Sequence, residues 1–348
     1  MKIIANARNQ SHMFDAEAGE KILDAGLRSG LTLPYECGSG TCGTCRARLV
    51  SGELTDAWPE APGRRLLKAE RAELLMCQNV ARTDCVVEVP FGKVEPMADG
   101  ACVPGRLAGV VRGVTPLTHD VVRFDLELDR PLRFEAGQFV LMGVEGLAGR
   151  RAYSMVNYDR PSPRLRLVVK KKPGGGVSEW LFGGSVEGAR VSLFGPMGAA
   201  IFTPEVDQPL LCMAGGSGIA GLMSILARAS AEGHFARHPG HVFFGVRTAA
   251  DLFFADELAA FKARAPERLE IVVALSEGEV DDGLRARHPA FTFDTGFVHE
   301  VTLRRMAHKF AGVRAYLAGP PPMVDASIRM LLKEARLGAS DIRYDKFS

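Results

Sequence analysis

The sequence predicts a multidomain chain in which an α+β region, an antiparallel β-barrel and an α/β region with a parallel sheet follow one another. Four cysteines lie near the start, short apolar runs punctuated by glycine and proline fill the middle, and apolar strands alternate with helical patterns in the last third. A length of 348 residues also exceeds what one hydrophobic core usually supports. We expect domains at 1–93, 105–204 and 205–348, with a linker containing proline and glycine at 94–104.

The first region is dominated by Cys37, Cys42, Cys45 and Cys77. The first three follow the spacing C-x4-C-x2-C, which is typical of plant-type [2Fe–2S] clusters, and the fourth follows after enough chain to fold back. All residues between the first three are small, and glycine permits the close backbone approach that a loop around a cluster needs. We predict these cysteines as ligands of a [2Fe–2S] cluster, which indicates one-electron transfer. Short helices are expected at 19–29 and 69–75.

Other uses of the cysteines are disfavoured by their pattern. Structural zinc sites usually present two short C-x2-C pairs, whereas only Cys42 and Cys45 form one here. A disulfide framework does not suit a chain of this length that begins without an apolar signal segment. A zinc-stabilised binding module or a non-catalytic redox sensor would also have no use for the nucleotide-binding motifs of the later regions.

Composition argues against several other classes of protein. The net charge is +2 and no block of lysine and arginine occurs, so we expect no nucleic-acid partner. The uncharged stretch 208–227 is long enough for a membrane span, but several glycines interrupt it. A buried strand, a glycine turn and a buried helix explain it better. We therefore expect a soluble, cytoplasmic protein without membrane insertion.

The middle region combines six expected strands with two motifs suited to a dinucleotide. Arg151, Tyr153 and Ser154 place a cation, an aromatic ring and a hydroxyl in one strand, so the arginine can pair with a diphosphate while the tyrosine covers a flat ring system. The segment 174–178 precedes a helical segment and offers a second phosphate site. Either motif alone would also fit an ordinary edge strand or turn. The expected strands are 109–114, 120–128, 138–144, 151–156, 165–170 and 189–194.

The last region alternates apolar strands with helical patterns, which predicts an open parallel sheet. Gly215, Gly216, Ser217 and Gly218 follow its first strand and open a helix. A helix N-terminus offers unpaired N–H groups and a partial positive charge to a pyrophosphate. The fingerprint G-x-G-x-x-G is met only loosely, and glycine also serves tight packing, so the assignment depends on this context. The expected strands are 210–214, 241–245, 270–275 and 314–318, and the expected helices are 219–231, 256–263 and 322–335.

With the three regions in this order, the sequence resembles the ferredoxin–NADH reductase components of bacterial multicomponent oxygenases over essentially its whole length. Residues 34–45 and 58–63 look like those of toluene monooxygenase reductases. Residues 173–184 and 319–326 look like the xylene monooxygenase electron-transfer component, and naphthalene-dioxygenase-type reductases share much of the pattern. The resemblance implies a β-grasp [2Fe–2S] ferredoxin domain, an antiparallel FAD-binding β-barrel and a parallel-sheet NAD-binding domain.

The resemblance also implies roles for individual residues. Arg151, Tyr153 and Ser154 match the R-x-Y-S motif that holds FAD, with Ser154 near the flavin N5. Phe347, in the closing D-x-F, is implied to lie close to the flavin, and it completes the implied catalytic set with Tyr153 and Ser154. The implied FAD diphosphate loop is Gly175, Gly176, Val177 and Ser178, the nicotinamide-nucleotide loop is Gly215, Gly216, Ser217 and Gly218, and the turn beside the nicotinamide is Gly319, Pro320 and Pro321.

Three positions depart from the family pattern. Ala136 and Gly221 stand where prolines are usual, and Ala318 stands where a cysteine often lines the nicotinamide pocket. That cysteine forms no covalent intermediate in the family. We therefore expect activity to survive its replacement, although the geometry of hydride transfer can differ.

The choice between NADH and NADPH has a physical cue at the ends of two strands. Relatives that use NADPH place an arginine beside a serine after the third strand, where it binds the 2′-phosphate. Here Ser276 is followed by Glu277, and Asp251 follows the Arg247 turn. Carboxylates repel a 2′-phosphate and can accept from a ribose hydroxyl, so NADH is predicted, with Arg247 and Glu277 at its site. A solvated Glu277 without this role is the alternative.

The resemblance implies electron transfer from NADH to FAD, to the [2Fe–2S] cluster and then to a partner. That partner is an oxygenase or hydroxylase component or an intermediary Rieske ferredoxin, and the reductase is expected to be a monomer when free. The match at 58–63 favours a hydrocarbon or aromatic monooxygenase, and a Rieske-type ring-hydroxylating dioxygenase system is the alternative. A membrane NADH–quinone reductase subunit is disfavoured, because it has a preceding membrane helix and a wider first cysteine gap. The sequence names neither the acceptor nor the oxygenated substrate.

Overall fold

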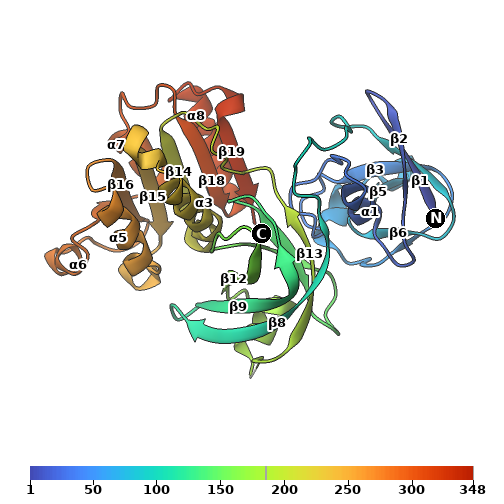
Figure 1. The fold of residues 1–348 in the computed structure, drawn as a ribbon, viewed down its shortest axis with the longest axis horizontal. Coiled ribbons are helices and arrows are strands. Elements are labelled where there is room, and N and C mark those ends of the chain that lie inside the picture. The colour runs from blue at the N-terminus through green and yellow to red at the C-terminus, as the bar shows by residue number, and fades with distance from the viewer. Residues whose placement is uncertain (185, 348) are drawn as a thin grey trace. The chain divides into compact units, whose positions relative to one another are not determined.

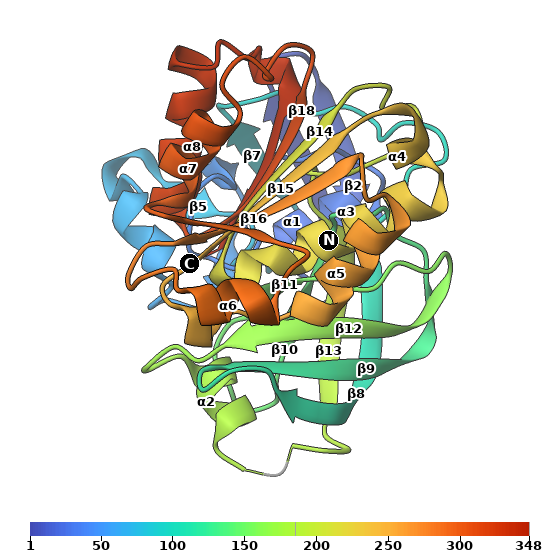
Figure 2. The ribbon, with the colours of Figure 1, turned by 90° about the vertical axis from the view of Figure 1, so that its left-hand side faces the viewer.

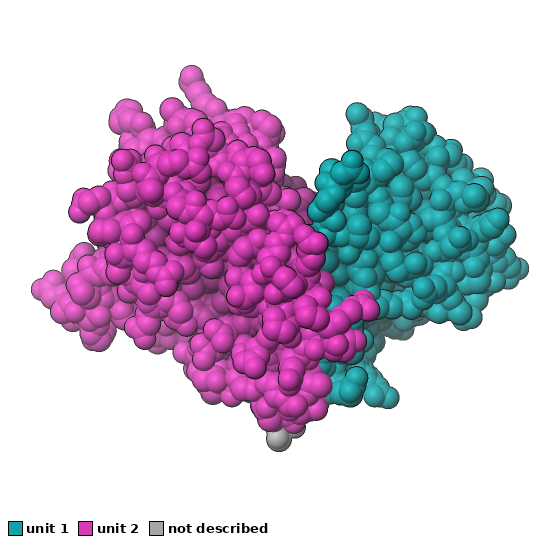
Figure 3. Space-filling view, viewed as in Figure 1, with its two compact units in different colours: residues 1–109, 139–153, 190–197 teal, residues 110–138, 154–189, 198–348 magenta. Residues whose placement is uncertain are grey.

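The computed structural model describes residues 1–184 and 186–347 (Figure 1). They form two compact units, which Figure 3 distinguishes by colour. The strands of the predicted barrel are divided between these units. Unit 1 contains residues 1–109, 139–153 and 190–197, and unit 2 contains residues 110–138, 154–189 and 198–348.

The cysteine-bearing part of unit 1 is a mixed five-stranded sheet in the order β2-β1-β7-β3-β5, with helix α1 (Ile22–Arg28) beside it. Strands β1 and β7 pair in parallel, and α1 buries Ile22, Leu23 and Ala25 in the core. This mixed sheet with a packed helix is the predicted β-grasp arrangement. The strands are β1 (Lys2–Ala7), β2 (Ser11–Asp15), β3 (Arg46–Ser51), β5 (Glu73–Leu75) and β7 (Cys85–Val89), with a separate pair β4 (Leu54–Asp56) and β6 (Asn79–Ala81).

The helix predicted at 69–75 is wrong, whereas the helix predicted at 19–29 is present as α1. Residues Ala69–Arg71 form a single 3₁₀ turn, and Ala72 then adopts a left-handed conformation with φ +50°. That conformation ends a helix. Residues Glu73–Leu75 instead form strand β5, which pairs antiparallel with β3. Tertiary pairing thus overrides the helical pattern of this segment.

The barrel region forms one six-stranded sheet in the order β11-β10-β13-β8-β9-β12. The pairs β10·β13 and β9·β12 are antiparallel. All six strands expected from the sequence are present, and helix α2 (Gly176–Phe182) follows β12 as expected. The strands are β8 (Gly105–Pro116), β9 (Val121–Leu132), β10 (Phe139–Gly143), β11 (Arg151–Ser154), β12 (Ser162–Lys170) and β13 (Arg190–Met197).

The last part of unit 2 is a parallel sheet in the order β17-β16-β15-β14-β18-β19. Its two faces are covered by different helices, since α3 and α5 contribute to one hydrophobic core and α7 and α8 to another (Figure 2). The strands are β14 (Leu210–Gly215), β15 (Gly240–Val246), β16 (Leu269–Leu275), β17 (Thr292–Thr295), β18 (Arg314–Gly319) and β19 (Ile342–Lys346). The helices are α3 (Ile219–Ala231), α4 (His234–Arg237), α5 (Ala255–Arg264), α6 (Asp282–Arg287), α7 (Val298–Arg305) and α8 (Pro321–Lys333).

The uncharged stretch 208–227 is explained by this sheet. It comprises strand β14, a 3₁₀ turn at Gly216–Gly218 and the start of helix α3, and nearly all of its apolar side chains are buried. Within residues 1–184 and 186–347, no helix is both long enough and apolar enough to span a bilayer.

Candidate functional site: a cluster loop and two nucleotide sites

The four predicted cluster ligands come together in unit 1. Cys45 Sγ lies 3.1 Å from Cys77 Sγ, and the Cys37 and Cys42 side chains are hydrogen-bonded to each other. A [2Fe–2S] cluster takes four cysteine ligands, two on each iron. The arrangement of the sulfurs in two pairs therefore fits the predicted cluster.

The loop between the first three cysteines has the backbone that the sequence predicts. Gly38, Gly40 and Gly43 have φ angles of +61°, +88° and +77°, a region that residues with a side chain rarely occupy. This conformation turns backbone N–H groups toward the sulfurs. Ser39 N donates to Cys37 Sγ at 3.4 Å, and Thr44 N donates to Cys42 Sγ at 3.5 Å.

The hydrogen bonds between the sulfurs favour the thiolate of one cysteine in each pair and the thiol of the other, since they raise the pKa values of Cys42 and Cys45. The hydrogen bond from Cys42 lowers the pKa of the Cys37 thiol to about 4, against the opposing effect of burial. In the same way, the hydrogen bond from Cys45 lowers the pKa of Cys77. Thiolates, not thiols, are the metal ligands of cysteine. One thiolate in each pair is thus already favoured before a metal contributes its own charge.

Two residues that the sequence interpretation missed support Cys77. Gln78 Nε2 donates to Cys77 Sγ at 3.4 Å, and Gln78 Oε1 accepts from Lys21 Nζ at 3.1 Å. Burial lowers the pKa of Lys21 to about 8, while nearby Asp24 and Cys77 oppose this change. Lys21 therefore brings a cationic group toward the cysteines from the start of α1. Its sequence position, far from the C-x4-C-x2-C motif, gave no signal of this role.

The predicted FAD residues lie on β11, at one edge of the barrel sheet. Arg151 and Tyr153 point to the same face because alternate residues of a strand share a face. Burial raises the pKa of Tyr153 above its ordinary value. Ser154 is 6% exposed, and its buried Oγ has no hydrogen-bond partner among the described residues. Buried hydroxyls are nearly always satisfied, so this atom fits a site that a cofactor completes.

Gly221, one of the departures from the family pattern, lies beside Ser154. A Cβ atom at position 221 would be 3.3 Å from Ser154 Cβ and 3.4 Å from Ser154 Oγ. The first turn of α3 thus approaches the strand that carries the implied flavin serine, and a larger residue at 221 would press on it. Both residues belong to unit 2.

The predicted diphosphate loop precedes helix α2, whose first residue is Gly176. Ser178 is 5% exposed, and its Oγ accepts from Lys172 N at 3.0 Å and lies 2.9 Å from the carbonyl oxygens of Lys172 and Gly175. The hydroxyl therefore closes the loop upon itself. Backbone N–H groups at Gly176 and Val177 start the helix and have no partner within it, which suits them to a phosphate.

The glycine turn after β14 packs against the end of β18. A Cβ atom at Gly218 would lie 2.3 Å from Ala318 O and 2.7 Å from Gly319 Cα, so no side chain fits there. The two predicted nicotinamide-nucleotide segments, Gly215–Gly218 and Gly319–Pro321, are thereby brought together. Both follow the carboxyl ends of parallel strands, where open α/β sheets bind their ligands.

The C-terminal D-x-F is placed by a strand that the sequence interpretation missed. Strand β19 pairs in parallel with β18, so that Asp345 lies opposite Ala318. Phe347 N then donates to Gly319 O at 3.1 Å. The backbone of Phe347 is therefore adjacent to the predicted nicotinamide turn.

Arg247 and Glu277 also lie side by side, just after the carboxyl ends of the neighbouring strands β15 and β16. Glu277 N donates to Arg247 O at 2.8 Å, because β15 and β16 are neighbours. Arg247 Nη2 lies 3.7 Å from Asp120 Oδ2. Asp251 caps the following turn through Oδ2, which accepts from Thr248 N at 2.9 Å. Its Oδ1 is buried without a hydrogen-bond partner among the described residues.

Models of three protein families match the chain in the predicted order. They are a 2Fe-2S iron-sulfur cluster binding domain over residues 6–82, an oxidoreductase FAD-binding domain over 109–202 and an oxidoreductase NAD-binding domain over 212–328. The predictions of fold class, of the cofactors and of an oxidoreductase are confirmed by these matches.

Similar proteins extend over nearly the whole chain. A ferredoxin–NAD(P)+ reductase, CarAd of Metapseudomonas resinovorans, is 36% identical over 95% of both chains. The ferredoxin–NAD+ reductase component of an alkene monooxygenase system of Xanthobacter autotrophicus is 32% identical over 97% of this chain and 99% of its own. A solved ferredoxin reductase of carbazole 1,9a-dioxygenase is similar with a TM-score of 0.81 and 32% identity, covering 100% of this chain and 99% of the other. The chain therefore belongs to the family of ferredoxin–NAD(P)+ reductase components of oxygenase systems.

Proposed function

We propose that this reductase uses NADH and delivers single electrons to a hydrocarbon or aromatic monooxygenase hydroxylase. The observation that carries the electron path from flavin to cluster is the packing of the cluster loop on the barrel within unit 1. A Cβ atom at Gly38 would lie 2.8 Å from Met197 Cε and 3.2 Å from Leu141 Cδ1, so the loop contacts strands β13 and β10 directly. This contact brings the cluster ligands to the same sheet that carries the implied flavin residues.

The cofactors supply the redox chemistry, since FAD accepts an electron pair from a nicotinamide and the [2Fe–2S] cluster takes electrons singly. The protein orients them. We assign Arg151 to the FAD diphosphate, Tyr153 to the face of the flavin ring and Ser154 Oγ to a hydrogen bond near N5. Tyr153 suits this place because its flat aromatic ring can cover a planar ring system. We assign Gly175, Gly176, Val177 and Ser178 to the diphosphate loop and Phe347 to the nicotinamide side of the flavin.

For the nicotinamide nucleotide, we assign the pyrophosphate to Gly215–Gly218 and the nicotinamide to the turn at Gly319 and Pro320. Arg247 and Glu277 are assigned to the adenosine end. The backbone hydrogen bond between them keeps the two strand ends adjacent. A carboxylate at this end of the site would repel a 2′-phosphate, which supports NADH over NADPH.

The monooxygenase partner is supported by the resemblance of residues 58–63, and a Rieske-type dioxygenase system is the alternative. One similar protein serves an alkene monooxygenase and another serves a carbazole dioxygenase, so both classes occur among close relatives. We also propose that the protein is a monomer when free and that it works in the reducing cytoplasm. The net charge of +2 supports the absence of a nucleic-acid partner. The domain limits 1–93, 105–204 and 205–348 remain our proposal.

The partner is tested by reoxidation of the NADH-reduced protein under anaerobic conditions. Purified di-iron hydroxylase and purified Rieske ferredoxin are each mixed with it, and recovery of the cluster absorbance gives two second-order rate constants. The proposal expects the rate constant with the hydroxylase to be the larger by tenfold or more. A larger value with the Rieske ferredoxin would instead establish the dioxygenase alternative.

A further inference from the structure

The indole ring of Trp58 lies against the guanidinium of Arg151. The Arg151 Cζ atom is 4.7 Å from the ring centroid, a cation–π contact, and Trp58 is 9% exposed. Both residues belong to unit 1. Trp58 follows strand β4 of the ferredoxin domain, whereas Arg151 begins β11 of the barrel. A residue of the cluster domain therefore covers one face of the arginine that we assign to FAD.

Gly149 shows how closely this contact is fitted. It has a φ of +69°, and a Cβ atom there would lie 2.5 Å from Trp58 Cε3 and Cζ3. Neither the conformation nor the space permits another residue without displacing the indole ring. Arg151 Nη1 also donates to Arg150 O at 3.1 Å, which further restrains the guanidinium.

The segment that carries Trp58 is closed into a rigid loop. Asp56 Oδ1 accepts from Trp58 N at 3.0 Å, and Asp56 Oδ2 forms an ion pair with Arg64. Ala61 N donates to Trp58 O at 3.0 Å. These bonds tie both ends of the segment 56–64 together, so the indole ring has a defined place relative to the rest of the loop.

The same segment is bonded to both cysteine-bearing stretches. Gly63 N donates to Gly40 O at 2.8 Å, inside the cluster loop, and Ala57 N donates to Gln78 O at 2.8 Å, directly after Cys77. Backbone hydrogen bonds thus link both cysteine-bearing stretches to the segment that carries Trp58. The indole ring of Trp58 then contacts the guanidinium of Arg151.

We propose that Trp58 is a positioning residue that holds Arg151 for the FAD diphosphate and couples this site to the cluster loop. The indole covers the flat face of the guanidinium and leaves N–H groups at its edge for phosphate oxygens. The ferredoxin domain thereby contributes to FAD affinity without touching the cofactor. This inference rests on the proposed role of Arg151.

The test is a double-mutant cycle on FAD affinity. Trp58→Leu, Arg151→Ala and the double variant are prepared with the cluster intact, the flavin is removed, and the FAD dissociation constant is measured by fluorescence quenching. Trp58→Leu is expected to raise the dissociation constant about tenfold, in the range of a partly buried cation–π contact. In the Arg151→Ala background the same substitution is expected to change it by less than about twofold.

Phe91→Leu is the matched control, because Arg46 Cζ lies 5.0 Å above the Phe91 ring in the same unit and neither residue is assigned to FAD. Its dissociation constant for FAD should equal that of the wild type. If Trp58→Leu loses its cluster, Trp58→Phe replaces it as the test of FAD affinity, since phenylalanine keeps a weaker π face. A rise of about threefold is then expected, and an unchanged value would contradict the proposal.

The outcomes separate this inference from the proposed function. If Arg151→Ala leaves FAD affinity unchanged, the assignment of Arg151 is wrong and the inference falls with it. If Arg151→Ala weakens FAD binding but Trp58→Leu does not, only the positioning role is overturned. Additive effects in the cycle would likewise overturn it, because a purely structural role of Trp58 does not depend on Arg151.

Discussion

Arg150 and Asp24 form a two-fold ion pair between residues 126 positions apart. Arg150 Nη2 donates to Asp24 Oδ1 at 2.8 Å, and Arg150 Nη1 lies 2.8 Å from Asp24 Oδ2. The Asp24 side chain is 5% exposed and that of Arg150 is 16% exposed. The guanidinium also lies over the Phe194 ring. This pair joins helix α1 to the residue just before β11 within unit 1.

Asp24→Asn should therefore destabilise unit 1 markedly. Removing one partner leaves the other charge buried without compensation, which costs about 3 kcal/mol or more. Urea unfolding followed by cluster absorbance measures the change. Glu88→Gln is the control, because its pair with Arg48 is exposed and should contribute less than about 1 kcal/mol. Equal losses in the free energy of unfolding for the two substitutions would show that the buried pair contributes no more than the exposed pair.

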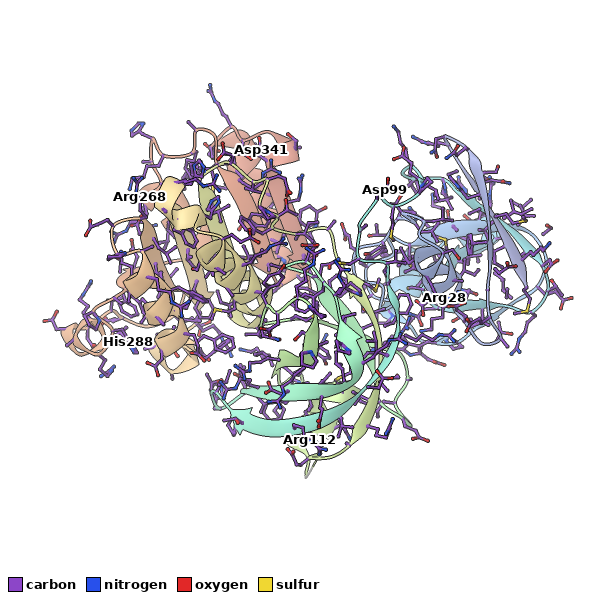
Figure 4. All side chains as sticks on the ribbon, viewed as in Figure 1. Arg28, Asp99, Arg112, Arg268, His288 and Asp341 are labelled. Atoms are coloured by element: carbon purple, nitrogen blue, oxygen red, sulfur yellow. The ribbon has the colours of Figure 1, made fainter. Side chains whose placement is uncertain are left out.

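Protonation of the buried Glu20 carboxylate should make the folded protein less stable at acid pH. Arg28 (labelled in Figure 4) donates from Nε and Nη2 to its two carboxylate oxygens, each at 2.8 Å. Burial favours the neutral acid, but these hydrogen bonds, the Glu17 N–H and Arg106 outweigh it and lower the pKa of Glu20. A lowered folded-state pKa gives stability that is present above the unfolded value of about 4.3 and is lost as pH falls through the folded value.

Glu20→Gln removes this dependence. At neutral pH the variant should be less stable than the wild type, and the difference should shrink as pH falls below about 4. Urea midpoints at pH 7, 4 and 3 measure it. Glu17→Gln, at a side chain 57% exposed, should show a much smaller difference. A constant gap between Glu20→Gln and the wild type across this range would contradict the assignment.

Ser154→Ala should separate activity from stability. Because Ser154 Oγ has no hydrogen-bond partner in the described protein, its loss should not lower the melting temperature. The rate of flavin reduction by NADH should fall about tenfold to a hundredfold, while NADH affinity stays the same. Anaerobic stopped-flow absorbance and thermal melting measure the two quantities.

Ser162→Ala is the matched control for Ser154→Ala. Ser162 is fully buried, and its Oγ donates to Arg164 O at 2.6 Å. Its loss should therefore lower the melting temperature and leave flavin reduction unchanged. If Ser154→Ala instead destabilises the protein and leaves the rate intact, Ser154 has only a structural role.

Glu277→Gln should relax the preference for NADH. Without the carboxylate, the ratio of kcat/KM for NADPH to that for NADH should rise about tenfold, as expected for removing one charge repulsion of roughly 1–2 kcal/mol. Steady-state kinetics with a chemical electron acceptor provide the values. Glu279→Gln, on the same exposed loop, should leave the ratio unchanged. If Glu277→Gln leaves the ratio unchanged, Glu277 is a solvated surface residue without a role in the choice between NADH and NADPH.

The sequence predicted those features whose signals are local. The cysteine ligands follow from spacing within one loop, and β14 with α3 follows from one apolar stretch with a glycine turn. Strand β19 was missed because its residues Ile342–Lys346 are mostly polar and half-buried at the sheet edge. Its position is set by pairing with β18, which no local pattern encodes.

The contacts between the cluster region and the barrel were also missed for a physical reason. Trp58 with Arg151 and Asp24 with Arg150 join segments far apart in the chain, and each residue alone is compatible with an ordinary surface or core position. A signal did exist for Trp58, since its segment matched a family motif. Only the folded chain shows which residue it contacts.

Electron transfer from NADH through FAD to the cluster is tested by an anaerobic titration of the purified protein with NADH, followed by visible absorbance and low-temperature EPR. We expect the flavin absorbance to bleach and a rhombic [2Fe–2S] signal to develop. Bleaching without that signal would mean that Cys37, Cys42, Cys45 and Cys77 hold something else. The absence of bleaching would contradict electron transfer from NADH altogether.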